Sequence, residues 1–238
     1  MGIHTRTVEY SDGEAVLEAY MAWDDSSHDS RPGVLIAHAW GGRGELEEGK
    51  AEQLAELGYV GFAIDLYGKG VHGASKEENA ALMQPLLDDR ALLQRRMQLA
   101  LEQIRKQNEV DTTRVAAMGF CFGGLCVLDL ARSGADVLGV ASFHGLFHKP
   151  GNTDGNKISA KVLVLHGWDD PMAKPAQAIE LAEELTKSGA DWQIHGYGNT
   201  MHAFTNPAAN DPALGTVYNA DADRRSWQSL QLFLAEIF

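Results

Sequence analysis

A single thiol stands among closely spaced glycines near the middle of the chain. The segment VAAMGFCFGGLC places Cys121 between Gly119 and the pair Gly123 and Gly124, directly after an apolar run. An unpaired cysteine is often a small core residue, which is how we interpret Cys126. Glycines two positions on either side of a nucleophile, however, are typical of a sharp turn between a strand and a helix that exposes a catalytic side chain. We therefore take Cys121 as a candidate nucleophile.

Two further groups that could act with a thiol follow later apolar segments. VLVLHGWDD ends on Asp169 and Asp170, and His202 lies in the loop after DWQIHGYG. In sheets of parallel strands, ligands bind at the carboxyl ends of the strands. The chain order of nucleophile, acid and histidine is also the order of the α/β-hydrolase triad. In that chemistry Cys121 attacks, His202 transfers the proton, and the aspartate orients the imidazole.

The surroundings expected for such a thiol also follow from the sequence. A helix beginning at Cys121 and a nearby imidazole both favour the thiolate. We expect the backbone amides of Trp40 and Phe122 to bind the oxyanion of a tetrahedral intermediate, at about 3 kcal/mol for each donor. The substrate pocket is expected to be lined by His38, Ala39, Tyr67, Trp168, Phe204 and Asn206. We interpret Asp65 and His166 as structural and His144 as a residue of the pocket rim.

Strand-like and helix-like segments alternate along the chain. Strands are expected at 15–23, 34–39, 59–65, 110–120, 137–145, 161–167 and 191–198, and helices at 45–57, 80–107 (one long or broken helix), 125–132, 174–189 and 222–238. This alternation predicts an α/β fold with a mostly parallel central sheet and helices on both faces. A length of 238 residues with 45% hydrophobic residues indicates one domain over residues 1–238.

Composition argues against several classes of partner. Twenty basic residues against 33 acidic ones give a net charge of -13. We therefore expect no nucleic-acid partner. MGIHTRTVEY contains no apolar signal core, and no long apolar run occurs, so we expect a cytoplasmic protein without a membrane partner. The two cysteines are expected to be reduced thiols, because they are too close for a useful disulfide and lack the partners of a zinc site.

Three motifs in sequence make the chain resemble the dienelactone hydrolase family of α/β-hydrolases. They are GFCFGG, HGWDDP and MHAFTNP, and IAHAWGG with GYVGFAIDLYGKG adds a further likeness. The resemblance covers nearly the whole chain. It implies an α/β-hydrolase fold and a triad of Cys121, Asp170 and His202, because the HGxxD pattern falls on Asp170 rather than Asp169. It also implies chemistry without a metal or organic cofactor.

The chain departs from that family at two positions. The family carries a glutamate in the first loop, which contacts the resting thiol, where this chain has Ala39. It also carries an arginine four residues after the catalytic histidine, which holds the substrate carboxylate, where this chain has Asn206. These differences favour small neutral or aryl esters or lactones as substrates of a cysteine-dependent ester hydrolase that forms a covalent acyl-enzyme.

Three other functions stay open. The same thiol could hydrolyse neutral phosphotriesters promiscuously, because the oxyanion donors could hold a phosphoryl oxygen. The protein could instead be a carboxymethylenebutenolidase, the dienelactone hydrolase proper. A protein of another class, with a redox-sensing thiol and no catalysis, is the third alternative. We expect a small-molecule ester as the ligand and a monomer or homodimer as the assembly.

Overall fold

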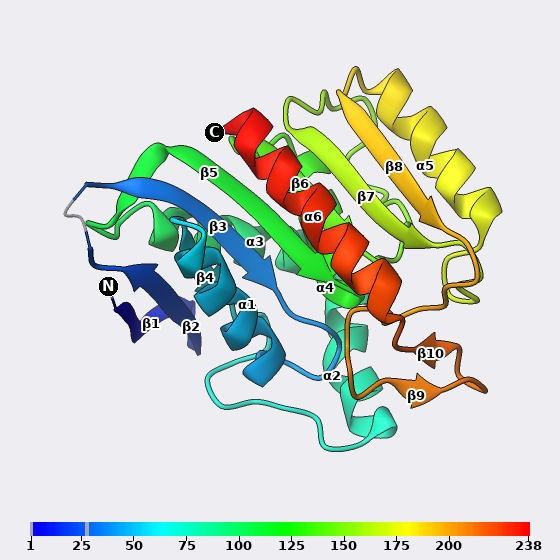
Figure 1. The fold of residues 1–238 in the computed structure, drawn as a ribbon, viewed down its shortest axis with the longest axis horizontal. Helices are drawn as coiled ribbons and strands as arrows, with labels where there is room; N and C mark the ends of the chain where they lie inside the picture. Colours follow the sequence, from blue (N-terminus) through cyan, green and yellow to red (C-terminus); the bar gives the residue numbers. More distant parts are fainter. Residues whose placement is uncertain (1, 27–28) are drawn as a thin grey trace. The chain divides into compact units, whose positions relative to one another are not determined.

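The structure, a computed structural model, describes residues 2–26 and 29–238. Its chain forms two compact units, residues 1–118 and residues 119–238. The elements labelled in Figure 1 are β1 (Ile3–Asp12), β2 (Ala15–Asp24), β3 (Arg31–Ala37), α1 (Glu45–Glu56), β4 (Val60–Ala63), α2 (Lys76–Asp88), α3 (Arg90–Ile104), β5 (Val110–Phe120), α4 (Phe122–Arg132), β6 (Gly139–Phe143), β7 (Lys161–Gly167), α5 (Pro175–Lys187), β8 (Trp192–Tyr197), β9 (Asn210–Asp211), β10 (Thr216–Val217) and α6 (Ala220–Ile237). The expectation of a single domain over residues 1–238 remains a prediction.

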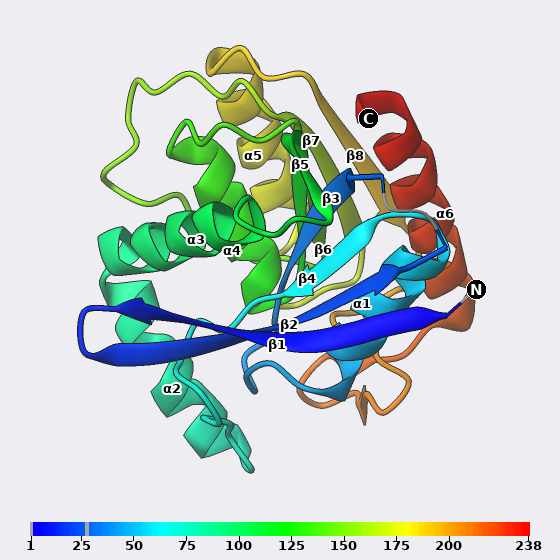
Figure 2. The ribbon, with the colours of Figure 1, turned by 90° about the vertical axis from the view of Figure 1, so that its left-hand side faces the viewer.

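The first unit places helices on both faces of its strands. β1 and β2 form an antiparallel hairpin, β2 pairs antiparallel with β4, and β4 pairs parallel with β3. A Cβ on Gly61 would lie 2.5 Å from Cα of Ala51 in α1, and a Cβ on Gly33 would lie 2.7 Å from Cδ1 of Ile104 in α3. Because Gly61 pairs with Val34, the neighbour of Gly33, the two glycines face opposite sides. Figure 2 accordingly shows α1 and α3 on opposite faces.

Two features of the first unit differ from the sequence prediction or refine it. The predicted helix over residues 80–107 is broken into α2 and α3, and Asp89 between them caps α3 by accepting a hydrogen bond from the Leu92 N–H at 2.9 Å. The strand β1 was not predicted. Tyr10 is the one buried residue of β1, and the sequence of this strand shows almost no alternation of apolar and polar residues. The segment is a strand because it pairs with β2 along its whole length.

The second unit carries the parallel strands β6, β7 and β8, which pair in this order. Every residue of β6 is buried, as is every residue of β7 but the first. Parallel strands with two covered faces are built from such continuous apolar runs. Figure 2 shows α6 on one face of these strands and α4 and α5 on the other. The polar residues that follow β6 and β7 therefore emerge at one edge of a buried layer.

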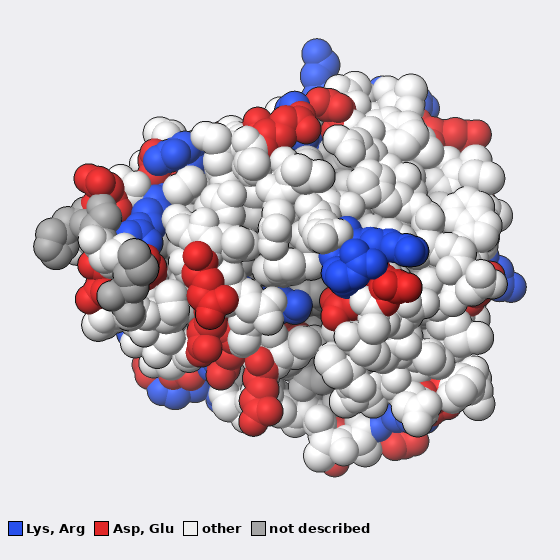
Figure 3. Space-filling view, in the orientation of Figure 1, with Lys and Arg blue, Asp and Glu red and all other residues white. Residues whose placement is uncertain are grey.

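Neither acidic nor basic side chains dominate the surface in view. On the face drawn in Figure 3, acidic and basic residues lie in separate small groups rather than in one broad patch of either sign. No helix in residues 2–26 and 29–238 combines the length and the apolar character needed to cross a lipid bilayer.

Candidate active site

Cys121 lies on a strained turn between β5 and α4. Its φ of 55° and ψ of -114° are unusual for a residue with a side chain. A Cβ on Gly119 would lie 2.2 Å from the carbonyl oxygen of Gly123, and a Cβ on Gly124 would lie 2.7 Å from Cα of Gly145. Only glycine fits at these two positions, because the chain folds back on itself there. This is the turn that the glycine spacing predicts.

The helix α4 starts directly at this cysteine. The carbonyl oxygen of Cys121 accepts hydrogen bonds from the amides of Gly124 at 3.0 Å and Leu125 at 3.3 Å. The first turn of a helix carries a partial positive charge, since its amides lack partners within the helix. The sequence prediction of a helix from Leu125 was too short at its start, because α4 begins at Phe122.

Asp170 and His202 form a buried pair in the same unit. Nδ1 of His202 lies 2.7 Å from Oδ2 of Asp170, and both side chains are almost completely buried. The other carboxylate oxygen accepts backbone hydrogen bonds from Met172 at 2.8 Å and Ala173 at 3.3 Å. The carboxylate is thereby held in one orientation, and its contact with Nδ1 fixes the orientation of the imidazole ring. Asp169, the alternative acid, is exposed.

The loop that carries His202 is anchored through its backbone. The His202 N–H donates to the Gly215 carbonyl at 2.9 Å, and the His202 carbonyl accepts from the Val217 N–H at 3.0 Å. Nε2 of His202 is buried. Burial by itself lowers the pKa of His202, but the negative charge of Cys121 and the hydrogen bond to Asp170 outweigh it and raise the pKa to about 10. The raised pKa favours the protonated form of the His202 imidazole.

His144 and Thr205 also lie beside these groups. The rings of His144 and His202 are 5.1 Å apart and meet edge to face. Nε2 of His144 lies 2.8 Å from Oγ1 of Thr205. The sequence interpretation assigned His144 only to the pocket rim and overlooked Thr205. One signal in the sequence could have identified His144 as a site residue: it follows an apolar strand, as the predicted triad members do.

The first unit holds the loop that carries Trp40. The Tyr67 hydroxyl donates to the Trp40 carbonyl at 2.9 Å. Buried His38 has Nδ1 at 2.6 Å from the Ala39 carbonyl, while its Nε2 accepts from the Leu66 N–H at 3.2 Å. Burial lowers the pKa of His38 to about 4, so this histidine is neutral. His38 and Tyr67 thus brace the backbone on either side of Trp40.

Glu47 is a further residue of this loop that the sequence interpretation missed. Its two carboxylate oxygens accept hydrogen bonds from the N–H groups of Ala39 at 3.2 Å and Gly44 at 3.1 Å. Its side chain is buried, and burial raises its pKa to about 7 despite these bonds. The carboxylate therefore clamps the two ends of the segment that contains Trp40.

The remaining predicted pocket residues belong to the second unit and differ in exposure. Trp168 is 43% exposed and covers Gly196 of β8. Phe204 is completely buried and meets the His144 ring edge to face at 5.1 Å. Asn206 is half-buried, and its side-chain oxygen accepts from the Ala208 N–H at 2.9 Å. Trp168 is the most accessible of the three to a ligand.

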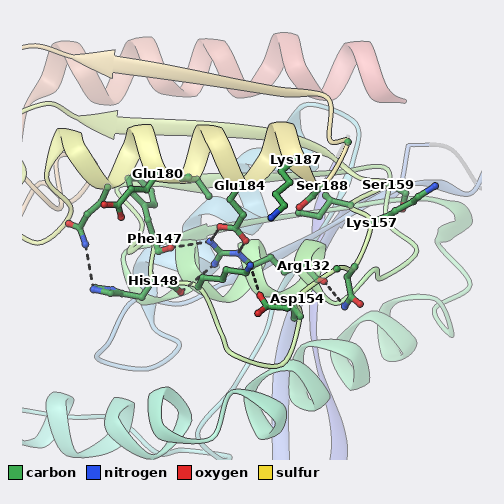
Figure 4. Close-up of a pocket in the computed structure, with 18 residues that line it drawn as sticks. Arg132, Phe147, His148, Asp154, Lys157, Ser159, Glu180, Glu184, Lys187 and Ser188 are labelled. Carbon is green, nitrogen blue, oxygen red and sulfur yellow. Dashed lines mark hydrogen bonds and ion pairs between the residues drawn. The ribbon is translucent and has the colours of Figure 1, made fainter.

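A separate cavity of about 1080 Å³ lies at the other end of α4 (Figure 4). Arg132, the last of the eleven residues of α4, is buried beside it, about 16 Å from Cys121 along the helix. Its guanidinium donates to Glu184 at 2.7 and 2.9 Å and to Asp129 at 3.2 Å. It also donates to the carbonyl oxygens of Phe147 and His148. Every side-chain N–H of Arg132 thus donates a hydrogen bond to another group of the protein.

Arg132→Ala is expected to lower the free energy of unfolding by about 3–5 kcal/mol, because it leaves carboxylates buried without their partner. Urea unfolding followed by circular dichroism measures this loss. Lys149→Ala is the matched control, since it removes an exposed ion pair with Asp154 at the same cavity and should leave the midpoint unchanged. Equal midpoints for Arg132→Ala and wild type would refute a stabilising role.

In residues 2–26 and 29–238, no group of three or more His, Cys, Asp or Glu side chains is arranged to hold a metal ion.

A family model and several similar proteins point to one family. The model of the dienelactone hydrolase family matches residues 17–238. A solved structure described as a dienelactone hydrolase-like promiscuous phosphotriesterase, P91, from metagenomic libraries is 35% identical, with a TM-score of 0.93 and 99% of each chain covered. Another, m3DLH, is 34% identical, with a TM-score of 0.95 and the same coverage. An Aquifex aeolicus protein named "Putative carboxymethylenebutenolidase" is 26% identical over 83% of this chain and 84% of its own.

Proposed function

Because the chain belongs to the dienelactone hydrolase family and has its α/β-hydrolase fold, we propose that it hydrolyses small neutral or aryl esters and lactones with Cys121 as the nucleophile. The observation that carries this proposal is the 2.7 Å contact between His202 and Asp170, in the same unit as the strained turn of Cys121. A thiol at a helix N-terminus, an imidazolium and an orienting carboxylate are the parts that acyl transfer through a thioester requires.

In the proposed reaction, the Cys121 thiolate attacks the acyl carbon and a C–S bond forms. The carbonyl electron pair moves to oxygen, where the amides of Trp40 and Phe122 are proposed to stabilise the charge. When the intermediate collapses, the C–O bond to the leaving group breaks and His202 gives its Nε2 proton to the departing alkoxide or phenoxide. His202 then takes a proton from water, which attacks the thioester, and release of the acid regenerates the thiolate.

Two positions support the proposed substrate class. By the resemblance of its motifs to those of the family, Ala39 matches the place of a thiol-contacting glutamate, and Asn206 matches the place of a carboxylate-binding arginine. Without these charges, a neutral acyl group is favoured over an anionic dienelactone. Hydrolysis of neutral phosphotriesters is the second candidate, and it is supported by the description of P91, which is 35% identical to this chain. Attack by the same thiolate on phosphorus would expel the aryloxide in the same way.

The test compares p-nitrophenyl acetate with a neutral p-nitrophenyl phosphotriester. Wild type should release p-nitrophenolate from the ester, and the ratio of the two rates ranks the two activities. A dienelactone assay decides whether the protein is instead a carboxymethylenebutenolidase. Absence of turnover on all three substrates, together with formation of a sulfenic acid at Cys121 by peroxide, would replace this proposal with the redox-sensing alternative.

The pH dependence of the ester reaction should have its alkaline limb near pH 10. His202 donates a proton to the leaving group, and its pKa of about 10 keeps it protonated up to that pH. The same raised pKa contributes stability that is complete below pH 6.5 and is lost as pH rises through about 10. A profile of kcat/KM against pH measures the limb, and loss of activity already between pH 6 and 7 on the alkaline side would contradict it.

A further inference from the structure

His144 occupies a strained and completely enclosed position directly after β6. Its φ is 37°, and its side chain is buried. Nδ1 of His144 lies 3.2 Å from the backbone nitrogen of Cys121, which also donates to the Phe143 carbonyl at 3.0 Å. The Cys121 amide is therefore shared between two acceptors, and one of them is the imidazole.

The tautomer of His144 follows from these partners. A backbone N–H can only donate, so Nδ1 of His144 must accept, and the ring proton is on Nε2. That proton points to Oγ1 of Thr205 at 2.8 Å. His144 is therefore a neutral bridge with one acceptor and one donor, both in use. Burial, followed by the charges of His202 and His166, holds the pKa of His144 well below its ordinary value, in keeping with a neutral ring.

The bridge connects the two segments that carry the predicted nucleophile and base. Thr205 lies three residues after His202, on the loop whose backbone is anchored by Gly215 and Val217. Between them, Ala203 has a φ of 57°, which places a second strained residue in this loop. Strained backbone persists where surrounding contacts hold it, and here His144 contacts both strained segments through hydrogen bonds.

We propose that His144 is a positioning residue that sets Sγ of Cys121 relative to the imidazole of His202 by tying the Cys121 amide to the Thr205 hydroxyl. This inference rests on the proposed cysteine chemistry. Displacements of about 1 Å between reacting groups can cost about 100-fold in rate, so the bridge should affect the rate of thiol attack and not substrate affinity.

Two substitutions separate the two hydrogen bonds. In His144→Asn, the side-chain oxygen can take the place of Nδ1 and keep the Cys121 bond, and asparagine tolerates positive φ. In His144→Gln, the amide can reach the place of Nε2 and keep the Thr205 bond while the Cys121 amide loses its imidazole acceptor. His148→Asn is the matched control, since His148 is exposed and four residues away.

The readouts are kcat and KM for p-nitrophenyl acetate and the rate of Cys121 alkylation by iodoacetamide. We expect His144→Gln to lower kcat and the alkylation rate by about 30- to 100-fold with KM unchanged, and Thr205→Val to lower kcat by about tenfold. His144→Asn keeps the Cys121 bond but loses the Thr205 bond, so it should lower the rates about tenfold as Thr205→Val does, and His148→Asn should match wild type. The double variant His144→Gln/Thr205→Val should be no slower than His144→Gln, because both changes break one bridge.

The proposal is overturned if His144→Gln unfolds at the wild-type midpoint yet keeps wild-type kcat and alkylation rate. If His144→Gln does not fold, the proposal is tested with Thr205→Val and His144→Asn. Wild-type kcat and alkylation rates in both of these variants would overturn it. Alkylation needs no ester substrate. A wild-type protein without esterase activity would therefore refute the proposed function, while the alkylation rates would still decide the role of His144.

Discussion

Cys121→Ala is expected to lower kcat for p-nitrophenyl acetate by about 10⁵- to 10⁶-fold and to abolish the initial burst of p-nitrophenolate. The thiol supplies the only electron pair that forms the acyl-enzyme in the proposed mechanism, so the whole covalent route is lost without it. The turn of Cys121 is set by Gly119 and Gly124, and an alanine keeps that backbone, so the loss would be chemical and not structural. Stopped-flow absorbance resolves the burst, and mass spectrometry of the quenched wild type should find the acyl group on Cys121.

Cys126→Ala is the matched control for this experiment. Cys126 is the second cysteine of the chain, lies in α4, the helix that begins directly after Cys121, and is completely buried. Its replacement should keep the burst and the acyl-enzyme. Equal turnover by wild type and Cys121→Ala would remove the cysteine from the mechanism and leave only a hydrolase of unknown nucleophile.

Asp170→Asn should lower kcat by about 10⁴-fold while KM changes little. The carboxylate accepts the Nδ1 proton of His202 at 2.7 Å, and an asparagine could present an N–H donor there and stabilise the wrong tautomer. One of the charges that raise the His202 pKa is also lost, so the alkaline limb should move from about pH 10 to a lower pH. Both effects are measured in one series of pH profiles.

Asp169→Asn tests whether the neighbouring carboxylate, and not Asp170, is the acid of the triad. Asp169 is exposed, and its described hydrogen bond runs through its backbone N–H to the Thr200 carbonyl at 3.0 Å. Its side chain can therefore change without altering the His202 pair, and kcat should stay within about twofold of wild type. A large loss at Asp169 and none at Asp170 would reassign the acid.

The sequence determined the local parts of this protein. Alternating strand and helix patterns predicted the α/β fold, and the family comparison and the structures of relatives confirm the α/β-hydrolase fold. The glycines around Cys121 predicted its sharp turn, because the steric limits on a backbone reversal act within a few residues. The chain order of Cys121, Asp170 and His202 predicted a triad, whose catalytic role is still to be tested. Where a signal was weak, as in the exposed strand β1, the prediction missed the element.

Only the tertiary structure decided which side chains meet. That His144 bridges Cys121 and Thr205, and that Glu47 clamps the loop of Trp40, depend on contacts between segments that are separated along the chain. It also decided that Phe204 is completely buried against His144. Periodicity shows which face of an element is apolar, but a hydrogen bond depends on positions accurate to a few tenths of an ångström. Those positions are set by the packing of whole layers, which no single stretch of sequence encodes.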